Sequence, residues 1–529
     1  MSPTGPGSVP RPAGTRPLAL SALRDLLGDP VQGDPATTVT GVTLASPEVR
    51  PGDLYAALPG ARTHGARYAA DAAGRGAVAV LTDPAGLEQA AATGLPVCVV
   101  DGPRALLGDV AARVYGEPAR RLPVIGITGT NGKTTTAYLV EAGLAAAGHG
   151  TGLIGTVQTR VRARGSETAF PSVRTTPEAP VLHALLATMA ESGVDTVVME
   201  VSSHALVQGR VGGVPFAAAG FTNLSQDHLD FHRDLEDYFR AKALLFDGRA
   251  AREVVVVDDD HGRRLAGMLG DRAVTVSAAG AGADWTATGV EAAPDGGSAF
   301  TLTGPGGTWP ARVRLPGRFN VTNAVLAVAL LDAVGVPVPA ALEGIGGAVV
   351  PGRMEPVDAG QPFTAVVDYA HTPDAVASAL AALRGATTGR LVTVLGCGGD
   401  RDPGKRPAMG AAAALGSDHL VVTDDNPRSE DPAAIRAAVL AGVPAERRGS
   451  VEEIGDRRAA IARAVALAGP GDTVLVAGKG HESGQEVAGT VTPFDDRAVL
   501  REVIAATTAA TTAATAATTA GTPAGAARR

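Results

Sequence analysis

Short runs of Val, Ile, Leu and Ala alternate with longer alanine-rich stretches along most of the chain. These runs lie at 77–81, 124–128, 196–201, 253–257, 364–367, 391–395, 419–422 and 473–476. Because they are continuously apolar and do not alternate with polar positions, they are typical of parallel strands that helices cover on both faces. The pattern therefore predicts an α/β protein built from several parallel-sheet units.

Two breaks in this pattern, one ending at Pro123 and one at 350–353, divide the chain into blocks. At about 100–200 residues per domain, 529 residues are expected to form three or four domains. We expect a Pro/Gly-rich disordered leader at 1–17, domains at 18–122, 123–350 and 351–504, and a mobile, low-complexity Ala/Thr tail at 505–529. Glycine-rich alternating segments at 278–316 predict a β-hairpin excursion from the central domain.

Composition narrows the class of protein. Hydrophobic residues make up 45% of the chain and charged residues 19%, which is enough to build buried cores and excludes a wholly disordered chain. The net charge of −8 lacks the basic footprint of a general nucleic-acid binder. Two cysteines exclude a disulfide framework, and no apolar run is long enough to cross a bilayer, so we expect a cytoplasmic protein without membrane insertion.

The segment VIGITGTNGKTTT at 124–136 carries the strongest chemical pattern. An apolar strand runs into a glycine-rich turn, and a helix is predicted over 134–147. Such a turn directs backbone N–H groups at a phosphate, Lys133 adds a positive charge, and the Thr134 hydroxyl can bind Mg²⁺. The strict P-loop pattern has glycine where Ile127 stands, so this is a variant. The alternative is a glycine-rich turn with an incidental lysine.

Three polar residues of the same block are candidates for metal chemistry. Glu200 ends a predicted strand, at the sheet edge where α/β proteins bind ligands, and a carboxylate beside a P-loop suits Mg²⁺. His228 lies in a loop dense in Asp and His and can bind a metal through a neutral imidazole, although a lone histidine is more often structural. Lys242 sits among apolar residues of a predicted helix, which by itself indicates a snorkelling lysine.

In the last block, polar loops follow three predicted strands, at 396–406, 423–428 and 478–482. The carboxyl ends of parallel strands meet at one edge, so these loops are expected to form one rim. Arg401 and Arg428 can bind carboxylates or phosphates, and Glu482 can accept from an ammonium group. A rim with both signs of charge suits a zwitterion such as an amino acid. Cys397 has no adjacent base and is predicted to be a packing residue.

Together these motifs resemble the Mur ligase family of peptidoglycan precursor synthesis, over nearly the whole chain between the tails. The resemblance implies three α/β domains: an N-terminal UDP-binding domain, a central P-loop ATPase domain with a parallel sheet, and a C-terminal Rossmann-like domain. It implies ATP and Mg²⁺ as cofactors. It also implies that Lys242, in Phe239-Arg-Ala-Lys242, is carbamylated and helps to hold a second Mg²⁺, which reverses the snorkelling interpretation.

The resemblance assigns further residues to each substrate. ATP is assigned to Gly129, Thr130, Asn131, Gly132, Lys133, Thr134, Thr135, Asn320, Asn323, Arg353 and Asp368. The UDP-sugar peptide is assigned to Ser46, Thr63, His64, Gly65, Thr175, Thr176, Ser203 and Arg210. The metal set is Thr134, Glu200, His228 and carbamylated Lys242, and Lys133, Glu200, His228 and Lys242 are the catalytic set. The family's Asp-Ser-Arg segment survives here only as Ser46.

The segment Asp425-Asn-Pro-Arg428 resembles the branch of the family that adds diaminopimelate, whose arginine meets the distal carboxylate. Diaminopimelate is lysine plus one carboxylate, so an extra guanidinium discriminates between the two. The pocket implied by the resemblance comprises Arg401, Asp425, Asn426, Arg428, Gly478 and Glu482. The sequence does not separate meso- from LL-diaminopimelate.

The implied reaction is ATP-dependent amide ligation through an acyl phosphate, with UDP-MurNAc-dipeptide, diaminopimelate and ATP as small-molecule substrates. We expect a monomer that closes around these reactants and excludes water. One alternative is a lysine-adding or other ligase of the superfamily, and Arg428 argues against it. Another is a P-loop nucleotide switch, which the predicted amino-acid pocket disfavours.

Overall fold

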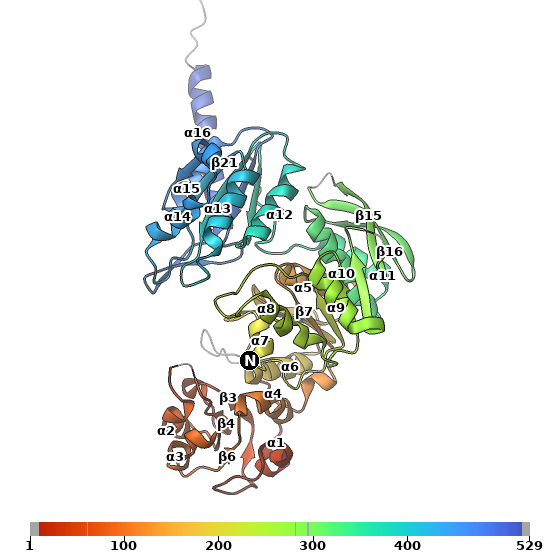
Figure 1. The fold of residues 1–529 in the computed structure, drawn as a ribbon, viewed down its shortest axis with the longest axis vertical. Helices are drawn as coiled ribbons and strands as arrows, with labels where there is room; N and C mark the ends of the chain where they lie inside the picture. The colour runs from red at the N-terminus through yellow and green to blue at the C-terminus, as the bar shows by residue number, and fades with distance from the viewer. Residues whose placement is uncertain (1–9, 61, 281, 294–295, 521–529) are drawn as a thin grey trace, which may run out of the picture.

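The computed structural model describes residues 10–60, 62–280, 282–293 and 296–520, with side chains through 508. Three α/β units follow one another along the long axis of the molecule, in chain order (Figure 1). Each unit has its own sheet, and these sheets contain four, eleven and six strands. All eight predicted apolar runs coincide with strands that pair in parallel with at least one neighbour. The predicted α/β class is confirmed.

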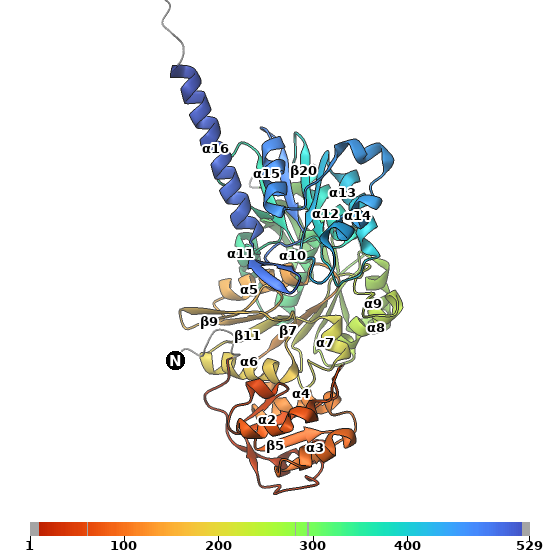
Figure 2. The same ribbon diagram turned by 90° about the vertical axis from the view of Figure 1, so that its left-hand side faces the viewer.

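The N-terminal unit is built on a parallel sheet of β3 (Gly41–Thr43), β4 (Asp53–Ala56), β5 (Ala79–Thr82) and β6 (Val97–Val99). Two short strands, β1 (Leu18–Ala19) and β2 (Thr38–Val39), pair beside it. The helices are α1 (Arg24–Leu27), α2 (Ala69–Gly74), α3 (Leu87–Ala91) and α4 (Pro103–Val114). The long helix α4 leads toward the central unit (Figure 2).

The central sheet has the order β10-β9-β8-β11-β7-β12-β13-β14-β15-β16-β17. Its parallel strands are β8 (Thr151–Ile154), β11 (Thr196–Glu200), β7 (Val124–Thr128), β12 (Ala218–Phe221), β13 (Glu253–Val256), β14 (Ala273–Ser277) and β15 (Trp285–Ala292). Antiparallel strands at the edges are β9 (Gln158–Ala163), β10 (Ser166–Pro171), β16 (Ser298–Gly304) and β17 (Gly307–Val313). The excursion expected at 278–316 is therefore a three-stranded antiparallel extension that continues this sheet.

Helices cover both faces of the central sheet because successive residues of a strand point to opposite sides. Ile125 and Ile127 of β7 pack in one core cluster with Leu139 of α5 (Lys133–Ala146) and Leu326 of α10 (Arg318–Ala333). Val124 packs on the other side, in a second cluster that includes α6 (Ala179–Ser192). The remaining helices are α7 (Ser203–Val207), α8 (Leu235–Ala243), α9 (Asp260–Leu269) and α11 (Val338–Gly347).

The C-terminal sheet has the order β18-β19-β23-β20-β21-β22. The strands are β18 (Glu355–Pro356), β19 (Thr364–Asp368), β20 (Leu391–Cys397), β21 (His419–Asp424), β22 (Val451–Glu453) and β23 (Thr473–Ala477), and a hairpin of β24 (Gly484–Val487) and β25 (Thr490–Pro493) follows. The helices are α12 (Pro373–Arg384), α13 (Lys405–Gly416), α14 (Pro432–Ala441), α15 (Arg457–Leu467) and α16 (Asp496–Ala520). All strand pairs of the six-stranded sheet except β18–β19 are parallel.

Both chain ends differ from the expectation where the structure describes them. Residues 505–520 continue α16 as one helix, whereas no regular element was predicted there from the sequence. Alanine has the highest helix propensity, and the docked residues Val499, Leu500 and Ile504 supply the costly helix nucleus. In the predicted leader, Arg11 pairs with Asp53, and the N–H groups of Ala13 and Gly14 donate to Glu191. Residues 1–9 and 521–529 lie outside the described residues.

No helix in the described part of the chain is both long enough and apolar enough to span a bilayer.

Candidate functional site

The glycine-rich loop between β7 and α5 takes a conformation that only glycine adopts easily. Gly129 has a φ of 145° and Gly132 a φ of 89°. A Cβ atom at Gly129 would overlap the side chain of Thr222, and one at Gly132 would overlap the side chain of Asn323. Helix α5 begins at Lys133, one residue before the predicted start. The loop is thus a narrow backbone turn at the start of a helix, as a phosphate site requires.

Side chains from within the loop and from the segment after β12 hold the loop in place. Lys133 Nζ donates to the carbonyl oxygens of Gly129 and Thr130, at 2.9 and 2.8 Å. The backbone N–H of Asn131 donates to the Asn223 side chain at 2.9 Å. Burial lowers the pKa of Lys133. A bound phosphate would offer this amine a stronger, charged partner than the two carbonyl groups.

Glu200, at the end of β11, lies directly beside the start of α5. Its carboxylate is buried and accepts from the Thr134 hydroxyl at 3.0 Å. It also accepts from the backbone N–H and hydroxyl of Thr156, at 2.8 and 3.0 Å. Arg353, from the segment before the C-terminal sheet, donates to the Thr134 hydroxyl at 3.1 Å. Thr134 therefore joins the glycine-rich loop, the acidic group and the next unit of the chain.

Lys242, on α8, is 1% exposed and points into the same loop. Its Nζ donates to the Gly129 carbonyl oxygen at 2.6 Å and lies 4.4 Å from the centre of the Tyr238 ring. Burial, and next the positive charge of Lys133, hold the pKa of Lys242 well below its ordinary value. This environment therefore favours the neutral amine more than water does. This position differs from that of a snorkelling lysine, whose charged end reaches water.

His228 is the most open of the four predicted catalytic residues. It has a φ of 56° and lies edge-on to His204, with ring centres 5.0 Å apart. Desolvation in this cluster lowers the pKa of His228, which favours the neutral imidazole that a metal needs. Over the residues that the structure describes, no three His, Cys, Asp or Glu side chains gather as a ready-made metal site.

Asp227, next to His228, was not singled out from the sequence. It is buried, and its carboxylate lies 3.5 Å from Lys405 Nζ and 3.9 Å from His371 Nε2, both in the C-terminal unit. Burial alone would raise the pKa of Asp227, but the neighbouring basic side chains of His228, His371 and Lys405 hold it below the ordinary value. A charged carboxylate of the central unit thus meets two basic groups of the C-terminal unit.

The residues predicted to contact the nucleotide lie on both sides of the loop. Asn323 donates to the Asn320 side chain at 3.2 Å and accepts from the Thr136 hydroxyl at 3.4 Å. Asp368, at the end of β19, accepts from the N–H groups of Met354 and Ala370. Burial raises the pKa of Asp368. The asparagine pair, on α10, lies beside the glycine-rich loop, while Asp368 braces the turn that carries Arg353.

The three predicted loops of the C-terminal unit do meet on one rim. Asn426 donates to the Glu482 carboxylate at 2.7 Å, and Lys479 Nζ donates to the Asn426 side-chain oxygen at 2.9 Å. Arg428 donates to the Gly399 carbonyl oxygen at 2.6 Å, and its Nε lies 3.6 Å from the Glu486 carboxylate. Arg401 lies on the same side, because a Cβ atom at Gly398 would lie 4.0 Å from its Cγ and 3.0 Å from an Arg428 nitrogen.

Two residues at this rim were not predicted from the sequence. Lys479 is buried, yet it stands in the Gly-Lys-Gly-His-Glu segment without an apolar periodicity to reveal it. Glu486 lies on β24, and this segment pairs with Arg428 through two backbone hydrogen bonds, of 3.0 and 2.7 Å.

Cys397 is buried with its sulfur 3.5 Å from the Met409 sulfur, and burial raises its pKa to about 12. It is a packing residue, as predicted.

The predicted sugar-peptide residues fall into two groups. The hydroxyl groups of Thr175 and Thr156 lie 3.0 Å apart, and Thr176 donates to the Glu200 carbonyl oxygen at 2.9 Å. Arg210 donates to the Thr176 carbonyl oxygen, so these residues border the acidic group. Ser203 lies near them and bonds to His232 at 2.9 Å.

The second group lies in the N-terminal unit. His64 bonds to Asp83 at 3.0 Å and accepts from the N–H of Ala66, while the N–H of Gly65 donates to Leu58. Ser46 is buried, and the Thr63 carbonyl oxygen accepts from the N–H of Gly60. The structure therefore places these four residues in the N-terminal unit, apart from the glycine-rich loop of the central unit (Figure 1).

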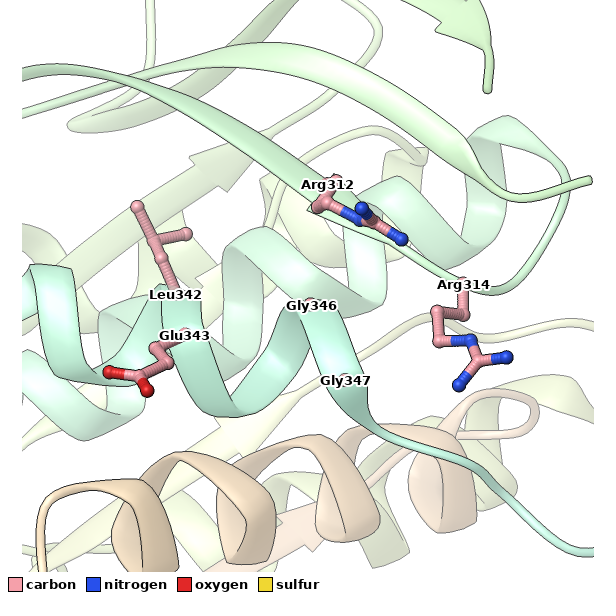
Figure 3. A pocket seen from close by; sticks show the side chains of 6 residues that line it. All are labelled: Arg312, Arg314, Leu342, Glu343, Gly346 and Gly347. Carbon is pink, nitrogen blue, oxygen red and sulfur yellow. The ribbon is translucent and has the colours of Figure 1, made fainter. Parts of the chain in front are cut away.

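A surface pocket away from all these residues lies between β17 and α11, and Figure 3 shows Arg312, Arg314 and Glu343 at its wall. It contains none of the predicted site residues.

Three protein families match the chain, one to each unit. Residues 38–115 match the Mur ligase family, catalytic domain. Residues 127–331 match the Mur ligase middle domain, and residues 352–480 match the Mur ligase, glutamate ligase domain.

Several relatives of high identity carry the same name. A "UDP-N-acetylmuramoyl-L-alanyl-D-glutamate--2,6-diaminopimelate ligase" of Streptomyces coelicolor is 57% identical over 511 residues, which cover 95% of this chain and 99% of the relative. A protein of the same name from Corynebacterium glutamicum is 49% identical, over 92% of this chain and 97% of the relative. A solved structure of a ligase of that name matches with a TM-score of 0.65 and 31% identity, over 93% of this chain and all of that one.

Proposed function

Because the chain belongs to the Mur ligase family, we propose that it adds diaminopimelate to UDP-N-acetylmuramoyl-L-alanyl-D-glutamate, with ATP as the energy source. The enzyme is an acid–amino-acid ligase of peptidoglycan precursor synthesis, like the relatives of that name. Since the reaction consumes ATP and small soluble substrates, the cytoplasm is its proposed compartment.

The observation that carries the choice of amino acid is the mixed-charge rim of the C-terminal unit. Arg428 is held there by the Gly399 carbonyl group and faces Glu486, while Glu482 lies beside Asn426 and Lys479. A guanidinium binds a carboxylate through two parallel hydrogen bonds, and a carboxylate accepts from an ammonium group. Diaminopimelate offers both groups at its distal end, whereas lysine lacks the carboxylate. Arg401, Asp425 and Gly478 complete the proposed pocket.

The glycine-rich loop is the proposed phosphate site. The N–H groups of 129–132 and the start of α5 would face the β- and γ-phosphates, with Lys133 turned from its carbonyl partners to the phosphate oxygens. Thr130, Asn131 and Thr135 line the same turn, and Asn320, Asn323, Arg353 and Asp368 are assigned to the rest of the nucleotide. A carboxylate of the sugar-peptide substrate attacks the γ-phosphate and becomes an acyl phosphate, with ADP as the leaving group.

The donor set fits Mg²⁺, which prefers oxygen ligands. The Thr134 hydroxyl and the Glu200 carboxylate are already 3.0 Å apart, and Lys242 reaches the same loop. When bound, Mg²⁺ would neutralise the charge between two anions that otherwise repel each other. Glu200 and Thr134 would hold one ion, and His228 and a carbamylated Lys242 would help to hold a second.

Lys242 meets the chemical condition for carbamylation. Carbon dioxide reacts with a neutral amine, forming an N–C bond while the nitrogen loses a proton. Burial lowers the pKa of this side chain, which favours the neutral amine that the reaction needs. The product is a carboxylate-like group beside the phosphate loop, where the unmodified side chain offers only hydrogen-bond donors.

The amine of diaminopimelate then attacks the acyl phosphate, which yields the amide and releases phosphate. The central and C-terminal units have to stay closed against each other during this step, because water would hydrolyse the acyl phosphate. The contacts of Asp227 with Lys405 and His371, and of Arg353 with Thr134, join the units across the site. The other end of the sugar peptide is assigned to Thr175, Thr176, Ser203 and Arg210, and its uridine to Ser46, Thr63, His64 and Gly65.

Phosphate release with UDP-MurNAc-L-Ala-D-Glu, ATP and Mg²⁺ tests the proposal. We would offer meso-diaminopimelate, LL-diaminopimelate, L-lysine or no amino acid, and analyse the product by mass spectrometry. Tripeptide formation with a diaminopimelate alone is the expected result, and it also names the isomer. Arg428→Ala should lower kcat/KM for diaminopimelate about 100-fold, since a partly buried, charged hydrogen-bond partner is lost. Equal turnover with lysine would overturn the assignment of Arg428, and turnover without any acceptor would overturn the ligase.

A further inference from the structure

A buried ion pair lies directly beneath the proposed amino-acid pocket. Arg457, the first residue of α15, donates through Nε and one terminal nitrogen to both carboxylate oxygens of Asp496, at 2.8 and 2.7 Å. Asp496 is the first residue of α16, and neither side chain is exposed. Removing such charges from water is costly unless their hydrogen bonds are all made. The pair therefore needs an explanation beyond stability.

The remaining hydrogen bonds of Arg457 go to the ends of two strands. One terminal nitrogen donates to the Asp424 carbonyl oxygen at 3.2 Å, and the other donates to the Ala477 carbonyl oxygen at 2.9 Å. Asp424 is the last residue of β21 and Ala477 the last of β23, and β20 lies between these two strands. A single planar guanidinium thus spans the sheet and ties the ends of two strands that do not touch each other.

Both pocket loops begin at the residues that Arg457 ties down. The segment Asp425-Asn-Pro-Arg428 follows Asp424 directly, and the segment 478–482 follows Ala477 directly. Above the pair, the loops hold each other through Asn426 with Glu482 and Lys479. An Arg457 nitrogen also lies 3.9 Å from the Asp425 carboxylate. The loops are therefore fixed from below by Arg457 and from above by their own side chains.

We propose that the Arg457–Asp496 pair is a positioning device that sets the spacing of the two loops that bind the acceptor amino acid. Because the Arg457 side chain is fully buried, it would act through Asn426, Arg428 and Glu482. This inference rests on the proposed function only for the identity of the amino acid, because the hydrogen bonds that define the device belong to the protein alone. Asp496 also makes the docked base of α16 part of the pocket's support.

Chemistry explains why this position needs arginine. Its fork of N–H donors serves a carboxylate and two carbonyl groups at the same time, which a lysine ammonium cannot do in one plane. Asp496 fixes the orientation of the fork through two parallel bonds. Asp496→Asn retains the shape but replaces one acceptor oxygen with an amide group, so one of those two bonds is lost.

The variants Asp496→Asn and Arg457→Lys test the proposal. A misplacement of about 1 Å in a site can lower the rate about 100-fold, so we expect kcat/KM for diaminopimelate to fall about 10- to 100-fold. The KM for ATP and for the UDP-linked substrate should stay within about twofold, because the P-loop lies on another unit. Glu502→Gln is the matched control. It removes an exposed pair, Arg458–Glu502, that joins the same two helices.

Hydrogen exchange gives a readout that is independent of turnover. Backbone amides of 425–428 and 478–482 should exchange faster in Asp496→Asn than in the wild type, while those of α5 stay unchanged. Unchanged exchange and unchanged KM in a folded Asp496→Asn would overturn the proposal. Equal losses for all three substrates would also overturn it, since they indicate general unfolding. A wild type that rejects diaminopimelate would instead overturn the proposed function, and the exchange experiment would still decide the role of the pair.

Discussion

The side-chain nitrogen of Lys242 lies 2.6 Å from the Gly129 carbonyl oxygen, although the two residues are 113 positions apart in the chain. This contact brings a buried amine from α8 into the loop that would hold phosphate. Burial, and next the positive charge of Lys133, lower the pKa of this amine and favour its neutral form.

We therefore expect Lys242 to take up carbon dioxide. In protein incubated with ¹³C-labelled bicarbonate, NMR should show a carbamate carbon signal that is absent from Lys242→Arg. The same substitution should lower kcat at least about 100-fold, because a group that neutralises the transferring phosphoryl charge is lost. An identical carbamate signal in both proteins would assign the modification to another amine.

Gly129→Ala should abolish nucleotide turnover. The new Cβ atom would overlap Thr222, and the φ of 145° is strained for any residue with a side chain. We expect binding of ATP, measured by calorimetry, to weaken at least about 100-fold, equal to about 3 kcal/mol. Gly148→Ala is the control: Gly148 also has a positive φ, of 85°, but its Cβ would meet nothing within 4 Å. Similar losses in both variants would show that strain alone explains the effect.

The contact between Asp227 and Lys405 should couple the two units energetically. Asp227→Asn and Lys405→Met are each expected to lower kcat about tenfold, because the closed arrangement loses a partly buried ion pair. The double variant should be little worse than the more severe single one, which corresponds to a coupling of about 1 kcal/mol. Asp230→Asn, an exposed neighbour, serves as the control. Strictly additive losses would mean that the two side chains act independently.

His183 should make the protein less stable in mild acid. It is fully buried on α6, bonds to the Gly212 carbonyl oxygen at 2.9 Å, and burial lowers its pKa to about 4. In the unfolded chain the pKa is about 6.5, so the unfolded state binds more protons between these values and stability falls as the pH drops from about 6.5 toward 4.

His183→Gln keeps a donor for Gly212 and removes this titration. Between pH 7 and 5, the variant should therefore lose about 2 kcal/mol less of its free energy of unfolding than the wild type. Urea unfolding at both pH values measures the difference. Between pH 7 and 9 the two proteins should respond alike, and a parallel decline in acid would contradict the assignment to His183.

The sequence predicted those parts of the fold whose signal is local. The strand at 124–128 was predicted with the same bounds as β7, and the start of the next helix was predicted one residue too late. An apolar run marks the strand, and glycines mark the turn before the helix. The rim of the C-terminal unit was predicted from strand ends, since parallel strands bring their carboxyl ends to one edge.

Contacts between distant charged residues left no such signal. Arg457 and Asp496 are 39 positions apart, and each stands in a polar segment that resembles an ordinary helix start. Asp227 meets Lys405 only after two units have docked. The helix at 505–520 was not predicted because the tract has no apolar periodicity. The high helix propensity of alanine and an anchored first turn are enough to form a helix there.

The helix α16 holds its far end at a distance from the C-terminal unit. It runs from Asp496, beneath the amino-acid pocket, to Ala520, and projects away from the C-terminal unit (Figure 2). At about 1.5 Å per residue, its 25 residues span about 37 Å. A dye or surface linker attached near its far end would be carried by a helix whose first turns are packed against the C-terminal unit. Its orientation would then report the movement of that unit as the enzyme opens and closes.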